Sequence, residues 1–107
     1  MFEDTIMKIS GIYLIHNLQN NYIYVGQSVN IVKRWDNHRS DLNCKRSNST
    51  YLQRAWTKYG SKNFDFSILE LIAPDKLDDA ERFWISYFQM IGYSLYDTMY
   101  NLNLVLS

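Results

Sequence analysis

The chain has 107 residues, of which 47% are hydrophobic and 16% aromatic, which predicts one folded domain over residues 1–107 with a single core. No apolar run approaches the roughly 18 residues that a membrane span needs, and no charged-then-apolar N-terminus indicates secretion. One cysteine cannot build a disulfide framework or a zinc site, so we expect a protein from a reducing, intracellular setting. Because no apolar run is long enough to span a membrane, we also expect no membrane association.

The formal net charge is zero, but the charges are unevenly distributed along the chain. Residues 33–62 carry a net charge of plus six, and residues 63–107 carry a net charge of minus five. A basic segment beside an acidic one predicts a dipolar molecule with one side that attracts phosphate. Charge runs are also common on faces that are merely solvated, and the charge pattern alone does not decide between the two.

A β-hairpin is predicted at the start of the chain. Residues 11–15 and 22–25 are β-branched and aromatic runs of strand length, and the Asn-rich residues 17–21 favour a turn. Tyr13 and Tyr24 share a face of this hairpin if the numbers of paired residues sum to an odd value. Neighbouring phenols at a surface could carry out proton chemistry, or both could simply fill the sheet.

Two helices are predicted after the hairpin, with a polar connector over residues 43–50. Ser28 or Asn30 can cap the first helix, and Arg34 and His38 lie four residues apart on one of its stripes. The second helix is expected at 50–59, where apolar residues recur with helical spacing, and Gly60 ends it. The main stripes are Ile31, Trp35, Arg39 and Leu42 in the first helix, and Leu52, Ala55, Trp56 and Tyr59 in the second.

A third strand and a third helix are predicted in the second half of the chain. Residues 64–72 become apolar on both sides, which predicts a strand more buried than the hairpin. Asp75 is expected to cap the helix and Gly92 to end it, and residues 93–106 should wrap back over the body. The apolar stripe of this helix is Leu77, Ala80, Trp84, Phe88 and Ile91.

Glu81 lies on or beside that apolar stripe. An ionised carboxylate at such a place is costly unless it is paired or binds a cation. Glu81 could pair with an arginine such as Arg34, or it could hold a metal at a cleft. The helical pattern leaves both interpretations open.

These motifs together resemble the GIY-YIG nuclease family over about residues 9–103, most closely the catalytic domain of intron-encoded homing endonucleases. Residues 11–13 and 24–26 match the signature pair, with Gly11 and Gly26 as its glycines. Residues 52–56, 58–60 and 64–70 also resemble segments of the homing enzymes. The residues placed as the family's site residues are Tyr13, Tyr24, Arg34, His38, Glu81 and Asn101.

The resemblance implies an α/β (α+β) fold, in which helices flank a small three-stranded antiparallel sheet in the order β-β-α-α-β-α. It also implies a site on one side of the sheet that hydrolyses a DNA phosphodiester with a single divalent cation. We expect Mg²⁺, with Mn²⁺ as a substitute, held by Glu81 with no second acidic group in the site. Basic residues expected to bind DNA are Lys33, Arg39, Lys45, Arg46, Arg54 and Lys58.

The implied roles follow from charge and proton affinity. Arg34 would lie on the scissile phosphate, and a phenol with a lowered pKa would take a proton from the attacking water. We favour Tyr13 as this base, with Tyr24 holding the water and His38 orienting or deprotonating the tyrosine. Asn101 would position Glu81 or the phosphate.

The sequence departs from the family pattern in two places. Gln27 stands where excision-repair members tend to carry lysine, and residues 47–49 lack the histidine that homing-type members often have there. The sequence contains no helix-turn-helix or zinc motif that would recognise a DNA sequence. Its sequence specificity would therefore be low, or would come from a separate DNA-targeting partner or from a homodimer. The alternatives are a non-catalytic nucleic-acid-binding module with the same fold and a plain interaction domain.

Overall fold

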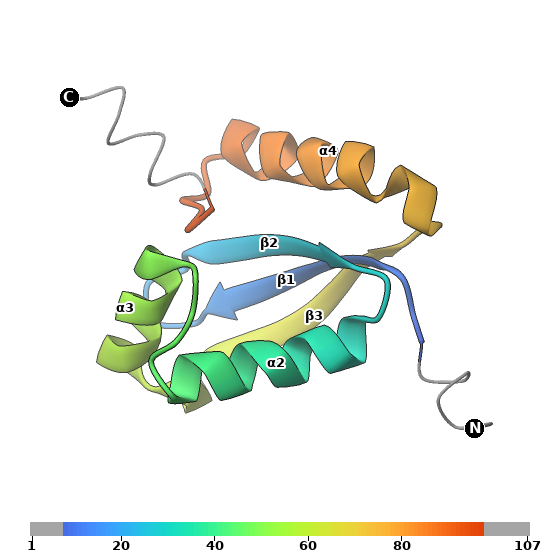
Figure 1. Ribbon diagram of the computed structural model, residues 1–107. Coiled ribbons are helices and arrows are strands. Elements are labelled where there is room, and N and C mark those ends of the chain that lie inside the picture. Colours follow the sequence, from blue (N-terminus) through green and yellow to red (C-terminus); the bar gives the residue numbers. More distant parts are fainter. Residues whose placement is uncertain (1–7, 98–107) are drawn as a thin grey trace.

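The computed structural model describes residues 8–97, which form three layers (Figure 1). A three-stranded antiparallel sheet with the order β2-β1-β3 lies between helix α4 on one face and helices α2 and α3 on the other. The predicted α/β class and element order are therefore confirmed. Within this described part, none of the helices has the length and apolar character that crossing a membrane would require.

Strands β1 (Gly11–Asn17) and β2 (Ile23–Ser28) form the predicted hairpin, and both run further than expected. Asn21 in the turn adopts a φ of 68°, which asparagine tolerates better than most residues. Tyr13 pairs with Gly26, so the paired numbers sum to an odd value and Tyr13 and Tyr24 share a face. That prediction is confirmed.

Helices α2 (Ile31–Asn43) and α3 (Thr50–Tyr59) lie where two helices were predicted, and α3 has the predicted extent. Asn30 caps α2, because its Oδ1 accepts a hydrogen bond from the backbone N–H of Lys33 at 3.2 Å. Gly60 follows α3 with a φ of 87°, a conformation that glycine adopts without a steric cost. Asn30 was one of the two predicted caps of the first helix, and Gly60 was correctly predicted to end the second.

Strand β3 (Phe64–Leu71) lies at the edge of the sheet, so the prediction that it is more buried than the hairpin is wrong. Ile68 and Leu71 are 41% and 62% exposed. The buried central strand is β1, which pairs with both neighbours. Apolar residues on both faces of this segment therefore indicated a strand, but they did not indicate a central position in the sheet.

Helix α4 (Leu77–Met90) follows a 3₁₀ turn, η2 (Pro74–Lys76), whereas another 3₁₀ turn, η1 (Ser61–Asn63), precedes β3. Asp75 lies inside η2 and does not cap the helix, so that prediction is wrong. Ile91 is 53% exposed beyond the last turn, which corrects its assignment to the apolar stripe. The rest of that stripe packs toward the sheet, with Leu77, Ala80 and Phe88 buried and Trp84 half-buried.

Two apolar clusters occupy the two faces of the sheet. The cluster beneath α2 and α3 contains alternate residues of β1, such as Tyr13 and Ile15, and the cluster beneath α4 contains Ile12. After α4 the chain returns to the sheet, where Leu95 forms a parallel bridge with Ile23. The predicted wrap over the body is confirmed up to residue 97.

Candidate active site

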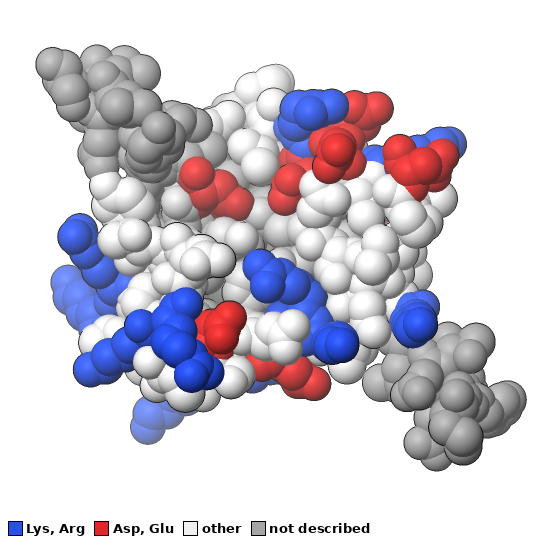
Figure 2. Space-filling model, in the orientation of Figure 1, with Lys and Arg blue, Asp and Glu red and all other residues white. Residues whose placement is uncertain are grey.

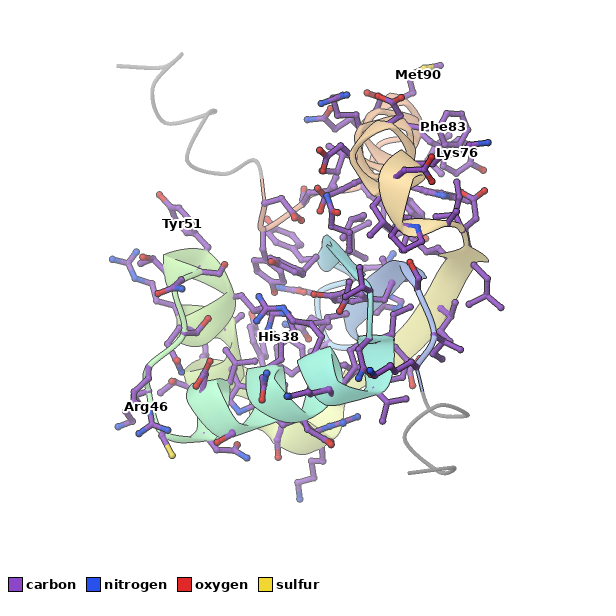
Figure 3. All side chains as sticks on the ribbon, turned by 45° about the vertical axis from the view of Figure 1, so that its right-hand side comes forward. His38, Arg46, Tyr51, Lys76, Phe83 and Met90 are labelled. Carbon is purple, nitrogen blue, oxygen red and sulfur yellow. The ribbon has the colours of Figure 1, made fainter. Side chains whose placement is uncertain are left out.

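The buried centre of the site is a hydrogen bond between the Tyr13 hydroxyl and His38 Nε2, which are 2.8 Å apart. Tyr13 projects from β1 and is 1% exposed, and His38 is 5% exposed where α2 faces the sheet (Figure 3). Burial raises the pKa of Tyr13 above its ordinary value and lowers the pKa of His38 to about 4. Both groups are therefore neutral near pH 7, and in the tautomer of His38 that carries its proton on Nδ1 the phenol donates to Nε2.

Gly26 makes room for the Tyr13 ring. The two residues are cross-strand partners, and a Cβ atom on Gly26 would overlap the Tyr13 Cζ and hydroxyl oxygen. Gly11 is restricted in the same way, because its Cβ would overlap the backbone carbonyl oxygen of Glu70 on β3. The two motif glycines therefore sit where another chain segment approaches too closely for a side chain.

Tyr24 contacts the same histidine and also borders a cavity. Its ring meets the His38 ring edge-on with a centroid separation of 5.4 Å. The half-buried Tyr24 lines a cavity of about 600 Å³ together with Arg54, Asp97 and residues 48–51 at the start of α3. Tyr13 does not line this cavity, so Tyr24 is the more accessible of the two phenols.

The expectation of a lowered phenol pKa is wrong for the protein alone. Burial raises the pKa of Tyr24 as it does that of Tyr13. The Arg34 guanidinium opposes both shifts through its charge and a side-chain hydrogen bond, but burial outweighs it. Arg34 does lie beside both tyrosines and His38, as the motif spacing predicted.

Glu81 reaches the site from α4, on the other face of the sheet from the two tyrosines. It is half-buried, and its Oε1 accepts a hydrogen bond from Gln27 Nε2 at 3.0 Å. No ion pair joins Glu81 to Arg34 within residues 8–97, so the first of the two interpretations of Glu81 is not supported. The negative charge of Glu81 nevertheless raises the pKa of Tyr24. The site therefore surrounds the edge strand β2 and is not confined to one side of the sheet.

A second carboxyl group, Asp97, corrects the expectation of a single acidic residue. Its Oδ1 accepts a hydrogen bond from the backbone N–H of Val25 at 2.9 Å. Burial, with a smaller contribution from Glu81, raises the pKa of Asp97 to about 7. The sequence did not predict Asp97 as a site residue because it follows an irregular segment. The preceding apolar residues Leu95 and Tyr96 are buried, and their apolar character was the available signal that this segment packs against the body of the protein.

These oxygen donors fit a hard cation such as Mg²⁺. Among residues 8–97 no three or more His, Cys, Asp or Glu side chains gather into a metal-binding group. A cation beside Glu81 and Asp97 would therefore have few protein ligands and would keep water or take substrate oxygens, as Mg²⁺ commonly does. Asn101, which we expected to assist Glu81, lies outside the described residues.

The residues expected to bind DNA are all exposed. Figure 2 shows Lys and Arg gathered most densely over α3 and the adjoining end of α2, at the lower left, whereas Asp and Glu gather over α4 at the upper right. Arg54 connects the basic side to the cavity beside Tyr24. The six residues are Lys33 and Arg39 on α2, Lys45 and Arg46 in the connector, and Arg54 and Lys58 on α3.

Residues 9–94 match the family model of the GIY-YIG catalytic domain. The chain belongs to the GIY-YIG family. This GIY-YIG domain is 39% identical over 95 residues to "Intron-associated endonuclease 1" of Enterobacteria phage T4, covering 85% of the chain and 38% of that relative. It is 35% identical over 98 residues to "Probable intron-encoded endonuclease 1" of Neurospora crassa, covering 85% of the chain and 29% of that relative.

Two solved structures resemble the GIY-YIG domain closely. A mutant of the catalytic domain of intron endonuclease I-TevI has a TM-score of 0.71 and 40% identity, with 76% of this chain and 84% of that chain covered. The catalytic domain of homing endonuclease I-TevI has the same TM-score of 0.71 and 38% identity, with 80% and 96% covered. The chain thus spans most of these catalytic domains but well under half the length of the two curated relatives.

Proposed function

We propose that the chain hydrolyses DNA phosphodiester bonds with one divalent cation. The observation that carries this proposal is the buried hydrogen bond between the Tyr13 hydroxyl and His38 Nε2, beside a second phenol on Tyr24. Burying these polar groups is costly, and a protein that only bound DNA would not need this arrangement. The names of the related endonucleases support the same reaction class.

Tyr13 serves as the proton acceptor in this proposal. Tyr24 borders the cavity and holds the attacking water, while Tyr13 takes a proton from that water and passes its own hydroxyl proton to His38 Nε2. The pKa of His38 is lowered to about 4, so its imidazole is neutral near pH 7, and in the tautomer that carries the proton on Nδ1 its Nε2 can accept the phenol proton. The relay leaves the buried phenol neutral and transfers the positive charge to His38.

Arg34 and Glu81 supply opposite charges on either side of β2. The Arg34 fork would bind the oxygens of the scissile phosphate and stabilise the additional negative charge of the transition state. Glu81 would hold Mg²⁺ or Mn²⁺, with Asp97 as a nearby second carboxyl group and Asn101 as a positioning residue. A bound cation would offset negative charge on the phosphate oxygens.

The basic face of α2 and α3 would bind the DNA backbone on the side where Arg54 borders the cavity. Contacts to phosphates carry no sequence information by themselves. We therefore propose that target choice depends on a second copy of the chain or on a separate DNA-targeting segment or partner.

The competing function is a nucleic-acid-binding module without turnover. A labelled DNA duplex distinguishes the two when binding and cleavage are measured on the same sample with Mg²⁺ or Mn²⁺. We expect binding that weakens steeply with salt, together with product that appears with either ion and not in EDTA. Binding without product under both ions would favour the binding module.

A further inference from the structure

We infer that Gln27 is a positioning residue that holds the Glu81 carboxylate ready for a cation, an inference that rests on the proposed function. Gln27 follows Gly26 on β2, and its side chain projects toward α4. Its Nε2 donates to Glu81 Oε1 at 3.0 Å and to Asp78 Oδ1 at 2.8 Å. One amide group thus bridges β2 to two carboxylates of α4.

The two carboxylates are suited to this bridge because of their spacing. Asp78 and Glu81 lie three residues apart in the helix, so they share a face, and like charges at this spacing repel each other. A primary amide has two N–H groups and can donate one to each carboxylate. Asp78 thereby anchors the amide, and the amide limits the orientations that Glu81 can adopt.

The bridge leaves half of the Glu81 carboxylate available. Within residues 8–97 its Oε1 is occupied by Gln27, and Oε2 has no hydrogen-bond partner. A neutral amide orients the carboxylate without cancelling its charge, so the attraction for a cation is retained. A lysine at position 27 would instead bring a competing positive charge to the same oxygen atoms.

The geometry also explains how a site with few protein ligands could bind a cation. A glutamate side chain loses rotamer freedom when it is immobilised, and that loss opposes binding. Because the Gln27 bridge already restricts Glu81 in the protein alone, part of this entropy has been lost before the cation arrives. The partners that orient a ligand commonly change metal affinity by about 10- to 100-fold.

The test is a Mn²⁺ titration of the protein without DNA, followed by electron paramagnetic resonance. Gln27→Met removes the amide donors at similar length, and we expect it to weaken Mn²⁺ binding by about ten-fold. The matched control is Gln19→Met, which also removes an amide hydrogen bond, from Nε2 to Asn63 Oδ1 at 3.1 Å, far from Glu81 in the turn. This control should bind Mn²⁺ as the wild type does.

A second variant, Gln27→Lys, keeps donor groups and adds a positive charge, and it should weaken Mn²⁺ binding at least as much. Wild-type affinity in a folded Gln27→Met or Gln27→Lys variant would overturn the inference. Glu81→Ala separates this failure from that of the proposed function. If Glu81→Ala loses Mn²⁺ binding while both Gln27 variants retain it, only the role of Gln27 is wrong; if Glu81→Ala binds Mn²⁺ normally, the proposed cation site itself is wrong.

Discussion

Gly26 connects the hairpin signature to a steric requirement. Its missing side chain leaves the space that the Tyr13 phenol occupies across the strand pair. We expect Gly26→Ala to lower the free energy of unfolding by about 3 kcal/mol, because the added methyl group forces the Tyr13 ring or the backbone to move. Denaturant unfolding measures this change.

Gly92→Ala is the control for that substitution. A Cβ at Gly92, at the end of α4, meets open space, and only its φ of 97° disfavours alanine, so the expected loss is about 1 kcal/mol. Equal losses in the two variants would contradict the steric explanation for Gly26.

His38 should make stability depend on pH. Its pKa is lowered from 6.5 to about 4 in the folded protein, so the unfolded chain binds more protons between these values. The free energy of unfolding should therefore decrease as pH falls from 6.5 to 4, by up to about 3 kcal/mol from this group.

Denaturant unfolding of the wild type and of His38→Gln over this pH range checks the prediction. Asp97 acts in the opposite direction, because its pKa is raised from 3.8 to about 7 and its contribution to stability is lost as pH rises. Asp97 is present in both proteins, so the difference between their pH profiles isolates His38. Parallel profiles would contradict the assignment of a neutral buried His38.

The two tyrosines should differ in their contribution to catalysis. Tyr13→Phe removes the proposed proton acceptor and should lower the single-turnover cleavage rate by about 100-fold or more. Tyr24→Phe removes a group that holds the water and should lower it by about ten-fold. Rapid-quench cleavage of a labelled duplex at saturating Mg²⁺ measures both rates, and a smaller effect of Tyr13→Phe would reverse the two roles.

Individual site residues were predictable where motif spacing and residue type act together. Tyr13, Tyr24, Arg34 and His38 come together because strand pairing and helix periodicity are local consequences of the sequence. The direction of the phenol pKa shifts was not predictable, since it depends on how far burial outweighs Arg34. Asp97 was missed because tertiary packing of an irregular segment places it.

At the level of secondary structure, the helices were predicted better than the position of each strand in the sheet. The helical spacing of apolar residues and the glycine that follows them predict α3 from a single short stretch of sequence. The edge position of β3 depends instead on its pairing with β1, which is distant in sequence. The apolar residues on both faces of β3 did not indicate whether one strand or two strands would pair with it.

The helices α2 and α3 with their connector should provide much of the affinity for DNA. Replacing Lys45, Arg46 and Arg54 together with alanine should reduce the slope of log affinity against log salt by about three, if each neutralises one phosphate. Fluorescence anisotropy at several salt concentrations in EDTA measures this slope without cleavage.

Lys76→Ala is the control for the basic helices. Lys76 lies at the start of α4, away from Arg46 at the α2–α3 connector (Figure 3). We expect Lys76→Ala to leave the salt slope unchanged. If Lys76→Ala alone reduced the slope by about one, which is the reduction expected for each residue of the triple variant, binding would not be confined to the basic face.

At the scale of the whole molecule, charge and chemistry are arranged around one edge strand. The basic helices lie on one side of β2, the acidic helix α4 lies on the other, and the side chains proposed for catalysis meet between them. A single site of this kind cuts one strand in each encounter, so one copy acting alone should produce nicked circles from a plasmid. Linear product formed without a nicked precursor would indicate two copies acting together.

The cation-dependent role of Glu81 is tested most directly by cleavage of supercoiled plasmid with wild-type protein and Glu81→Gln. This substitution keeps the size of the side chain and removes its charge. We expect the wild type to cut the plasmid in Mg²⁺ and not in EDTA, and Glu81→Gln to lose at least about 1,000-fold in rate while it remains folded and binds DNA. Cleavage by Glu81→Gln at the wild-type rate, or wild-type cleavage in EDTA, would contradict the proposed mechanism.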